Sequence, residues 1–380
     1  MAGFTRQRTT EDVAELARER IADCFRRFDR VVVWFSGGKD STVVLDLAYE
    51  VARSMGRLPL EAVHWDEEAI HPETVEYVQR VSERDGISLR WFCYPVKHRN
   101  ACSREEPWWY PWAPEDEAKW CRPLPAKAIT SLPRTPSERL PIPQLNGHVL
   151  GDRACSTVVL TGIRAQESLR RLRIVMMKEH DNWLSQDPYA PHVMIAKPIY
   201  DWTTEDVWTA PRLFGWDYNR AYDVMTLAGV SRHGQRVCPP YGEEPLQGLW
   251  RYAECWPHLW EKMIARVPGA ATAGRYSRSP LYGFGDRRKE PPVGMTWQQA
   301  VHAAIMKWPE DQRPLVAARV RQEITAHDGR TGGAPIKGHV TGAEELSWSF
   351  LLMLAERGDF KGRRTMAFKQ TEEEGTTRYE

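Results

Sequence analysis

The segment Val31-Val32-Val33-Trp34-Phe35-Ser36-Gly37-Gly38-Lys39-Asp40-Ser41-Thr42 decides the fold of this chain. Its first five residues are apolar and rich in β-branched and aromatic side chains, which predicts a strand buried on both faces. From Thr42 to Met55 the apolar residues recur at helical spacing, and Gly56 ends that pattern. The segment therefore predicts a strand, a glycine-containing loop and a helix in direct succession.

A loop of this kind suits a phosphate group. Gly37 and Gly38 permit backbone angles that direct several N–H groups toward one point, and Lys39 adds a full positive charge to the partial charge of the helix N-terminus. Three hydroxyl groups can donate hydrogen bonds to the same phosphate oxygens, those of Ser36, Ser41 and Thr42. We therefore expect the loop to bind phosphate.

Asp40 is the residue at which we expect Mg²⁺, because this ion prefers carboxylate, water and phosphate oxygens. No glycine precedes the Gly38-Lys39 pair at the spacing of a Walker loop, so the loop belongs to another class of phosphate site. The alternative is a tight turn with a surface lysine, which the complete hexapeptide between strand and helix disfavours.

Strands and helices alternate along the first part of the chain. Further strands are predicted at Leu60–Trp65, Leu89–Tyr94, Ser156–Thr161 and Val193–Ile199, and further helices at Glu11–Phe28, Pro72–Asp85 and from Thr203 onward. This alternation predicts an α/β fold with a doubly wound, mainly parallel sheet, in which ligands bind at the carboxyl ends of the strands.

The chain divides by composition into three predicted parts. Residues 1–217 form a nucleotide-binding α/β domain with a Trp- and Pro-rich insertion at about 95–154, in which residues 130–146 are expected to be a surface loop. Residues 218–360 form a helical C-terminal region, and residues 361–380 a loose tail. Three helices are expected in the C-terminal region, at Pro245–Val267, Thr296–His327 and Ala343–Arg357.

Composition limits the classes of function. The chain has 380 residues, 42% of them hydrophobic, which is enough for a sizeable core. With 52 basic and 51 acidic residues it is no global polycation, so an anion site must come from local clustering. The absence of a long apolar run predicts no membrane contact and a cytoplasmic location, and the 7 scattered cysteines are expected to be reduced.

The hexapeptide Ser36 to Ser41 resembles the pyrophosphate loop (PP-loop) of the ATP pyrophosphatases, which belong to the adenine nucleotide alpha hydrolase-like superfamily. Other segments resemble one branch of it, the PAPS (phosphoadenosine phosphosulfate) reductase family. These segments are His64-Trp65-Asp66 with His71-Pro72-Glu73-Thr74, Trp120-Cys121-Arg122, Thr161 to Ser168 with its Gly-x-Arg-x-x-Glu-Ser pattern, and Pro198 to Trp208. The resemblance implies a HUP-like fold, and it implies that Gly162 and Arg164 join the loop in binding the nucleotide.

Two later segments, Arg236 to Gly242 and Arg266 to Ala270, resemble an uncharacterised branch of the same family. Relatives of this kind include DNA phosphorothioation enzymes and accessory proteins of some type IV CRISPR loci. The resemblance therefore leaves open a protein or nucleic-acid complex as partner, bound through the Trp-rich insertion or the helical C-terminal region.

The chain departs from the PAPS reductases in its cysteines. Sulfite-releasing members use a thiol in a Glu-Cys-Gly-Leu-His segment near the C-terminus, whereas this chain has no cysteine after Cys255. The family's iron–sulfur ligands, a Cys-Cys pair and a Cys-x-x-Cys, are also missing, so we expect no iron–sulfur cluster. Ordinary sulfonucleotide reduction is therefore disfavoured.

Several residues have both a functional and a structural interpretation. For Arg164 a role in the phosphate site is favoured over a place on a solvated helix face. For the three arginines that follow it, Arg170, Arg171 and Arg173, both interpretations stay open. Asp66 would face the adenosine or its metal, or cap a helix. Cys121 and Cys238, alone or with Cys102 and Cys255, are expected to be inert rather than reactive, and His64 and His71 to be structural. The insertion's basic and aromatic residues would stack on a base, form a lid or pack as a loop; they are Arg99, Arg104, Lys119, Trp108, Trp109 and Trp112.

The sequence thus predicts an adenine-nucleotide enzyme of the ATP pyrophosphatase type. Lys39 and the loop amides would hold the pyrophosphate of Mg-ATP, Asp40 the metal, and Arg164 the charge on the transferred group, leaving AMP or an adenylylated acceptor. Two alternatives stay open: a PAPS- or PAP-binding reductase-like protein that uses an external thiol, and an adaptor of a nucleic-acid-targeting complex that binds ATP without turnover.

Overall fold

The computed structural model of the protein describes residues 11–103, 105–150, 155–167, 171–172, 175, 181, 183–238, 240–242, 245–277, 289–339 and 346–357. Its contacts divide the chain into two units. The α/β unit comprises Glu11–Gln166 and Val175–Gly285, and the C-terminal helical unit comprises Asp286–Glu380 with Met1–Thr10 and Glu167–Ile174. Each unit is described by itself.

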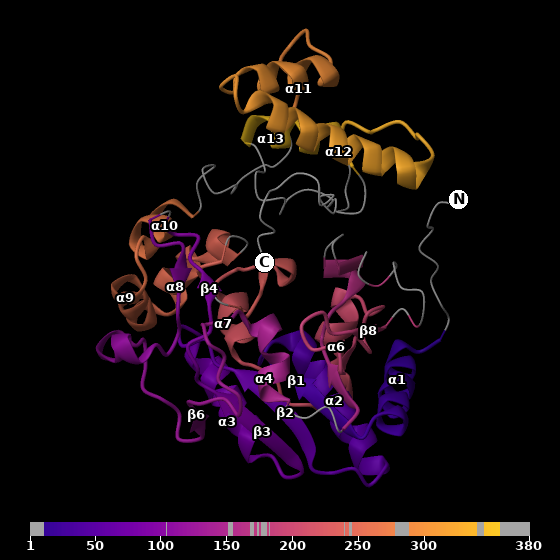
Figure 1. Ribbon diagram of the computed structural model, residues 1–380, viewed down its shortest axis with the longest axis vertical. Coiled ribbons are helices and arrows are strands. Elements are labelled where there is room, and N and C mark those ends of the chain that lie inside the picture. The colour runs from indigo at the N-terminus through magenta and orange to yellow at the C-terminus, as the bar shows by residue number, and fades with distance from the viewer. Residues whose placement is uncertain are drawn as a thin grey trace. The chain divides into compact units, whose positions relative to one another are not determined.

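A seven-stranded sheet forms the centre of the α/β unit, in the order β6-β3-β2-β1-β7-β9-β8 (Figure 1). The strands are β1 (Arg30–Trp34), β2 (Leu60–Trp65), β3 (Ile87–Phe92), β6 (Ala128–Ile129), β7 (Thr157–Leu160), β8 (Leu184–Gln186) and β9 (Val193–Ala196). Every neighbouring pair is parallel except β8 and β9. Since β1 lies between β2 and β7, the strand order reverses at its end, where doubly wound sheets bind their ligands.

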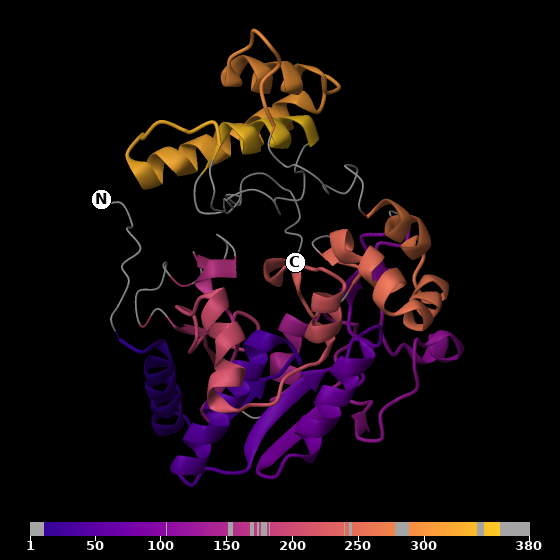
Figure 2. The ribbon, with the colours of Figure 1, turned by 180° about the vertical axis from the view of Figure 1, so that it is seen from behind.

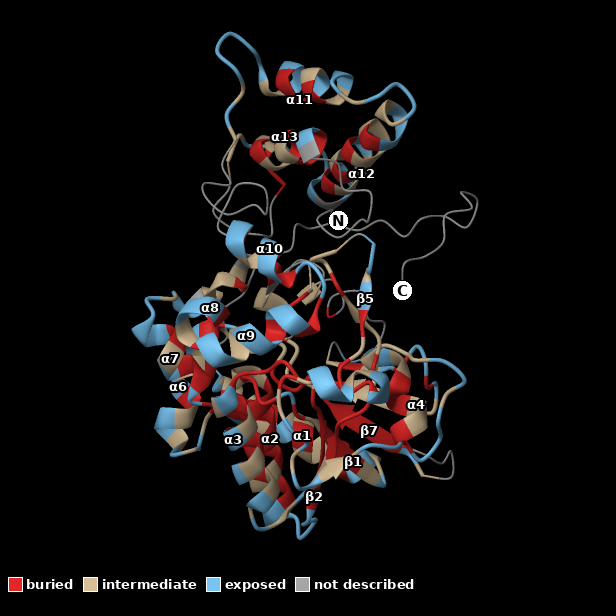
Figure 3. Cartoon of the chain, turned by 90° about the vertical axis from the view of Figure 1, so that its left-hand side faces the viewer, coloured by how far each residue is buried: buried red, intermediate tan, exposed pale blue. Residues whose placement is uncertain are grey.

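Helices cover both faces of this sheet (Figures 1 and 2). Alternate residues of β1 point to opposite faces, so Val31 and Val33 belong to one hydrophobic cluster and Val32 to another. The first cluster contains residues of α1 (Val13–Arg27), α2 (Lys39–Ser54), α3 (Pro72–Glu83) and α6 (Thr204–Phe214), and the second contains residues of η2 (Ile142–Leu145) and α4 (Asn146–Val149). Figure 3 shows the strands as the buried layer between them. The predicted fold class is confirmed.

Short elements complete the α/β unit. They are the hairpin of β4 (His98–Arg99) and β5 (Trp108–Trp109), the 3₁₀ turns η1 (Pro114–Lys119), η3 (Ala165–Glu167), η4 (Arg232–Gly234) and η5 (Pro245–Gly248), and the helices α7 (Ala221–Leu227), α8 (Trp250–Cys255), α9 (Pro257–Arg266) and α10 (Ala270–Tyr276). The helix expected at Pro245–Val267 is therefore three elements, because Pro257 cannot continue α8 and instead starts α9.

The insertion is more integrated than the sequence indicates. Its strand β6 pairs with β3, and Leu132 and Leu145 are buried against the second face of the sheet. The stretch 130–146, expected to be a surface loop, therefore supplies part of the core. Its few apolar residues lack periodicity because they pack singly between turns rather than along one helix face.

Two buried carboxylates fix the insertion to the sheet. Asp66, directly after β2, accepts a hydrogen bond from Trp91 Nε1 at 2.7 Å and pairs with Arg122 of the insertion. Glu68, fully buried and with a positive φ of 62°, accepts the backbone N–H groups of Trp112 and Cys121 and pairs with Arg266 of α9 at 3.0 Å. The end of β2 thereby joins the insertion and the last helices of the unit.

The C-terminal helical unit contains α11 (Trp297–Met306), α12 (Arg313–Thr331) and α13 (Trp348–Arg357). They share a small core that includes Val301, Val320 and Leu351. The helix expected at Thr296–His327 is divided between α11 and α12, and Pro309 and Pro314 lie at the division. The predicted boundary near residue 217 and the tail 361–380 stay predictions, since the tail lies outside the described residues.

We predict that stability falls below neutral pH because His71 is buried. Its ring stacks on Tyr252 and contacts Trp256 at an interplanar angle of 56°, and burial lowers its pKa from 6.5 to about 3. The unfolded chain takes up this proton below about pH 6.5 and the folded chain does not, so the stability present above pH 6.5 is lost as the pH falls toward 3. Near pH 5 the loss is about 2 kcal/mol.

The test compares urea unfolding of wild type and His71→Phe at pH 7 and pH 5. Phenylalanine keeps the aromatic stacking and does not titrate, so the variant should lose about 2 kcal/mol less than wild type over this range. His258→Phe, at a side chain 98% exposed, should behave as wild type. An equal loss in wild type and His71→Phe would contradict the assignment.

Candidate functional site

The loop between β1 and α2 lies at the switch point of the sheet. Gly37 has a φ of +73°, which a side chain would strain, and a Cβ there would also press on Thr74 and Val78. Gly38 is the N-cap of α2, so the first amides of a 16-residue helix lie at the end of the loop. The predicted strand, loop and helix are all present.

The hydroxyl groups of the loop hold one another in place. Ser36 Oγ lies 2.9 Å from Ser41 Oγ, and Ser41 and Thr42 both donate to the carbonyl of Gly38 at 3.0 Å. Tyr77 of α3 donates to Thr42 Oγ1 at 3.1 Å. These contacts fix the shape of the loop, so Ser41 and Thr42, both buried, serve its geometry.

Lys39, Asp40 and Arg164 meet at the start of α2. Asp40 Oδ2 lies 3.2 Å from Lys39 Nζ, and Asp40 Oδ1 lies 2.5 Å from Arg164 Nε. Arg164 is only 2% exposed and also donates to the carbonyl of Trp202, which rules out the solvated helix face considered for it. Two cations therefore gather around one carboxylate beside the loop.

Gly162 allows Arg164 to come close to Asp40 and Lys39. It follows β7, and a Cβ at this position would lie 2.8 Å from the carbonyl carbon of Asp40 and 2.9 Å from the amide of Ser41. Because those atoms belong to the backbone of α2, no side chain could move aside to make room. The exit of β7 thus approaches the helix N-terminus as closely as only glycine permits.

Two further residues of the site come from beyond residue 217. The N–H of Lys39 donates to the hydroxyl of Tyr222 at 2.9 Å, and Asn219 donates to the carbonyl of Gly37 at 2.9 Å and to Thr74 Oγ1. Burial raises the pKa of Tyr222, so its hydroxyl stays protonated and can donate a hydrogen bond. The sequence carried no signal for either residue, because both lie in a short helix and turn without a recognisable motif.

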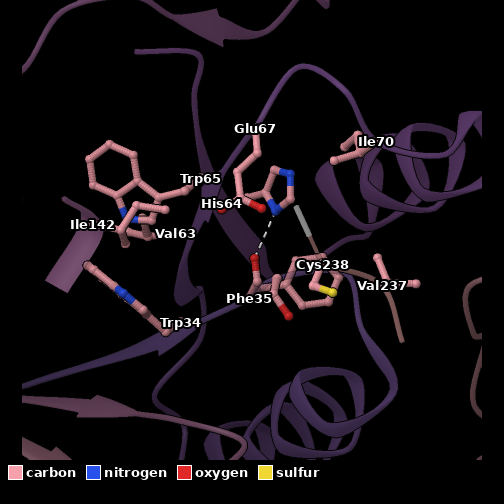
Figure 4. Close-up of a pocket in the computed structure, with 11 residues that line it drawn as sticks. Trp34, Phe35, Val63, His64, Trp65, Glu67, Ile70, Ile142, Val237 and Cys238 are labelled. Carbon is pink, nitrogen blue, oxygen red and sulfur yellow. Dashed lines mark hydrogen bonds between the residues drawn. The ribbon is translucent and has the colours of Figure 1, made fainter. Parts of the chain in front are cut away.

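A cavity of about 230 Å³ opens beside the loop at the ends of β1 and β2 (Figure 4). Its lining is mostly apolar and comprises Trp34, Phe35, Ser36, Val63, His64, Trp65, Glu67, Ile70, Ile142, Val237 and Cys238. Ser36 connects it to the phosphate loop. The cavity is smaller than the roughly 300–1,000 Å³ that enclose a whole drug-sized ligand, so it fits one flat ring.

Asp66 does not line this cavity. Its carboxylate accepts hydrogen bonds from Trp91, Trp112 and the backbone N–H of Glu68, besides its ion pair with Arg122. These contacts favour the structural interpretation of Asp66, and its contact with a nucleotide stays a prediction.

The other candidates are spread over the unit. Burial raises the pKa of the Cys121 thiol, and raises that of Cys102 to about 12, so both are poor nucleophiles at neutral pH. Trp109 and Trp112 are buried, whereas Trp108 is exposed and has Lys97 and Arg99 over its ring. Arg104, Arg170 and Arg173 lie outside the described residues.

The donor set at Asp40 bears on the expected Mg²⁺. Both carboxylate oxygens are engaged, one by Lys39 and one by Arg164. In the part of the chain that the structure describes, no three His, Cys, Asp or Glu side chains are grouped to hold a metal ion. The residues therefore do not fit a resident ion in this arrangement, and the role of Asp40 as a metal ligand stays a prediction.

Comparison with known proteins identifies the family. Residues 30–226 match the phosphoadenosine phosphosulfate reductase domain, a range that holds the sheet, the loop, Gly162 and Arg164. The chain belongs to this family. The resemblance recognised in the sequence is thereby confirmed, while the CRISPR association stays a prediction.

Two further matches extend this result. Residues 229–367 match a domain of unknown function, DUF3440. The uncharacterized protein YbdN of Escherichia coli (strain K12) is 32% identical over 314 residues, which cover 79% of this chain and 76% of that protein.

Solved structures show weaker likeness. The FMN adenylyltransferase of Candida glabrata matches with a TM-score of 0.33 and 14% identity, over 57% of this chain and 62% of its own length. The PAPS reductase of Candida auris, a phosphate complex, matches with a TM-score of 0.31 and 13% identity, over 58% of this chain and 94% of its own. The fold assignment rests on the strand order rather than on these scores.

Among the described residues, no helix is long and apolar enough to cross a membrane.

We predict that Gly162→Ala weakens nucleotide binding, because the added methyl group forces β7 away from the start of α2. Nucleotide affinity should fall at least about tenfold, and the free energy of unfolding by about 1–3 kcal/mol. Calorimetric titration and urea unfolding measure the two effects. Gly215→Ala is the control: Gly215 has a positive φ, which Gly162 does not, but nothing lies within 4 Å of the position of its Cβ, so stability should fall without loss of affinity. Unchanged affinity in Gly162→Ala would refute the proposed site.

Proposed function

We propose that the protein binds ATP with its phosphates over the loop Ser36–Thr42 and cleaves it between the α and β phosphates. The observation that carries this proposal is the convergence of Lys39 and Arg164 on Asp40 beside the N-terminus of α2. Membership of the phosphoadenosine phosphosulfate reductase domain family supports an adenine nucleotide as the ligand. Positive charge and helix amides gather where a polyphosphate would bind.

The chemistry would be positioning and charge neutralisation. An acceptor, water or another nucleophile, attacks the α-phosphorus while the bond to the bridging oxygen breaks, and the electron pair leaves with pyrophosphate. Lys39 and the loop amides would bind that leaving group. Arg164, held by the carbonyl of Trp202, would stabilise the charge that develops on the α-phosphoryl oxygens.

Asp40 would keep both cations in place before the nucleotide arrives. Lys39 has a side chain only 13% exposed, and Arg164 is buried, so each needs a nearby anion in the empty protein. A triphosphate can replace that anion, so ATP binding would loosen one of the two ion pairs. Only then would Asp40 have an oxygen for the Mg²⁺ that accompanies ATP.

Tyr222 adds a donor to this site. Its hydroxyl accepts the N–H of Lys39, and its own proton can be donated to a phosphate oxygen over the loop. Cleavage would leave AMP or an adenylylated acceptor on the protein.

Family membership also favours a second candidate, in which the same loop binds PAPS or PAP and an external thiol performs the reduction. Both candidates use Lys39 and Arg164 as phosphate ligands. They differ in the nucleotide preferred and in whether AMP appears.

We predict that Lys39→Ala lowers AMP formation from ATP at least about a hundredfold, as expected for loss of one charged ligand of the leaving group. The experiment incubates the full chain with Mg-ATP, separates AMP and pyrophosphate by chromatography, and titrates ATP and PAPS calorimetrically. Lys307→Ala, at an exposed lysine of the other unit, is the matched control and should retain wild-type activity.

Three results would overturn this function. AMP formation that survives in Lys39→Ala would remove the loop from the chemistry. Preference of the wild type for PAPS would select the reductase-like candidate. Tight ATP binding without AMP would select an adaptor that senses the nucleotide without cleaving it.

A further inference from the structure

Two residues that line the cavity beside Ser36 each have a buried polar atom for which the described residues provide no hydrogen-bond partner. They are His64 Nε2 and Trp65 Nε1. Leaving a buried polar atom unpaired is unfavourable, so a ligand that pairs with it gains affinity. Both atoms lie at the end of β2, next to the proposed phosphate loop.

The hydrogen bonding of His64 fixes which kind of ligand atom it can meet. His64 Nδ1 lies 2.8 Å from the carbonyl oxygen of Phe35, as the dashed line in Figure 4 shows. A carbonyl can only accept, so Nδ1 carries the proton and Nε2 presents a lone pair. His64 is therefore an acceptor toward the cavity and not a donor.

The charge state of His64 agrees with this assignment. Burial lowers the pKa of the ring below its usual value of 6.5, against the opposing influence of Asp66 and Glu67; Arg122 is the nearby cation and acts in the same direction as burial. The ring is neutral at physiological pH, and Nε2 keeps its lone pair.

The ring is also held rigidly. Trp91 packs against it edge-on at 5.7 Å and Phe35 lies at 6.1 Å, while Asp66 holds the indole of Trp91 through a 2.7 Å hydrogen bond. In Figure 4 the ring has Nδ1 toward Phe35 and Nε2 on the side of Glu67 and Ile70, two residues that line the cavity. A fixed acceptor can discriminate between ligands better than a mobile one.

We infer that His64 determines base specificity in this site, with Nε2 accepting a hydrogen bond from the exocyclic amino group of adenine. The inference rests on the proposed function, because the position of the phosphates over Ser36–Thr42 brings the base to the cavity. The apolar walls suit a flat ring, and adenine presents an amino group where hypoxanthine and guanine present a carbonyl oxygen. That oxygen would face the lone pair of His64 and be rejected.

The first test measures the affinity of the wild-type full chain for three triphosphates: ATP, purine riboside triphosphate with hydrogen in place of the amino group, and inosine triphosphate. ATP should bind about 3- to 10-fold more tightly than the purine analogue, because one hydrogen bond contributes about this much affinity. Inosine triphosphate should bind more weakly still, since its oxygen is repelled.

Two variants assign this preference to His64. His64→Phe keeps an aromatic ring without an acceptor, and the ratio of ATP to purine analogue affinity should fall to about one. His64→Gln can place an amide oxygen near the position of Nε2 and should restore part of the ratio. The ratio is taken within one protein, so a partly unfolded variant does not distort it. His258→Gln, at an exposed histidine of α9, should keep the wild-type ratio.

The outcomes separate this inference from the proposed function. If no triphosphate binds, both are overturned. If ATP and the purine analogue bind wild type equally, nucleotide binding stands and the role of His64 is overturned. A preference that survives in His64→Phe assigns the acceptor to another group, such as the carboxylate of Glu67 in the lining, and overturns the role of His64.

Discussion

The contact between the end of β7 and the start of α2 is the constraint on which the site depends. At the reversal of strand order the chain passes so close to Asp40 that only a glycine fits, and the same turn delivers a buried arginine to the Asp40 carboxylate. The helix amides, Lys39 and Arg164 are thereby brought together without any of them reaching far from its own backbone. Preorganised charge of this kind needs little rearrangement when a phosphate binds.

Much of this arrangement could be predicted from the sequence, because it depends on local patterns. The buried strand, the Gly37-Gly38 loop and the apolar spacing of α2 each have a short-range signal, and the motif around Gly162 resembles a known family. Tyr222 and Asn219 could not be predicted, since they reach the loop only through tertiary packing. The contact of Asp66 with the nucleotide stays a prediction: the insertion supplies Arg122 and Trp112 to its carboxylate, and no local pattern of the sequence indicates these partners.

The insertion shows why composition alone does not reveal burial. The lack of periodicity in residues 130–146 suggested a surface loop, yet Leu132 and Leu145 are buried there and β6, just before it, extends the sheet. The physical reason is that Asp66 and Glu68 provide buried acceptors for its backbone and cations, which lets an irregular segment enter the interior without unpaired polar groups. The residues that receive the insertion lie far from it in sequence, and no local pattern connects them.

The ion pair of Glu68 with Arg266 joins positions 198 residues apart. During synthesis Glu68 leaves the ribosome long before its partner, so this carboxylate must stay hydrated until nearly the whole α/β unit has been made. Contacts of such sequence separation slow folding, because a long loop must close before they form. All seven strands of the sheet are made before α9, so they can pair while Glu68 still lacks Arg266, and the buried ion pair at the end of β2 forms only when α9 arrives.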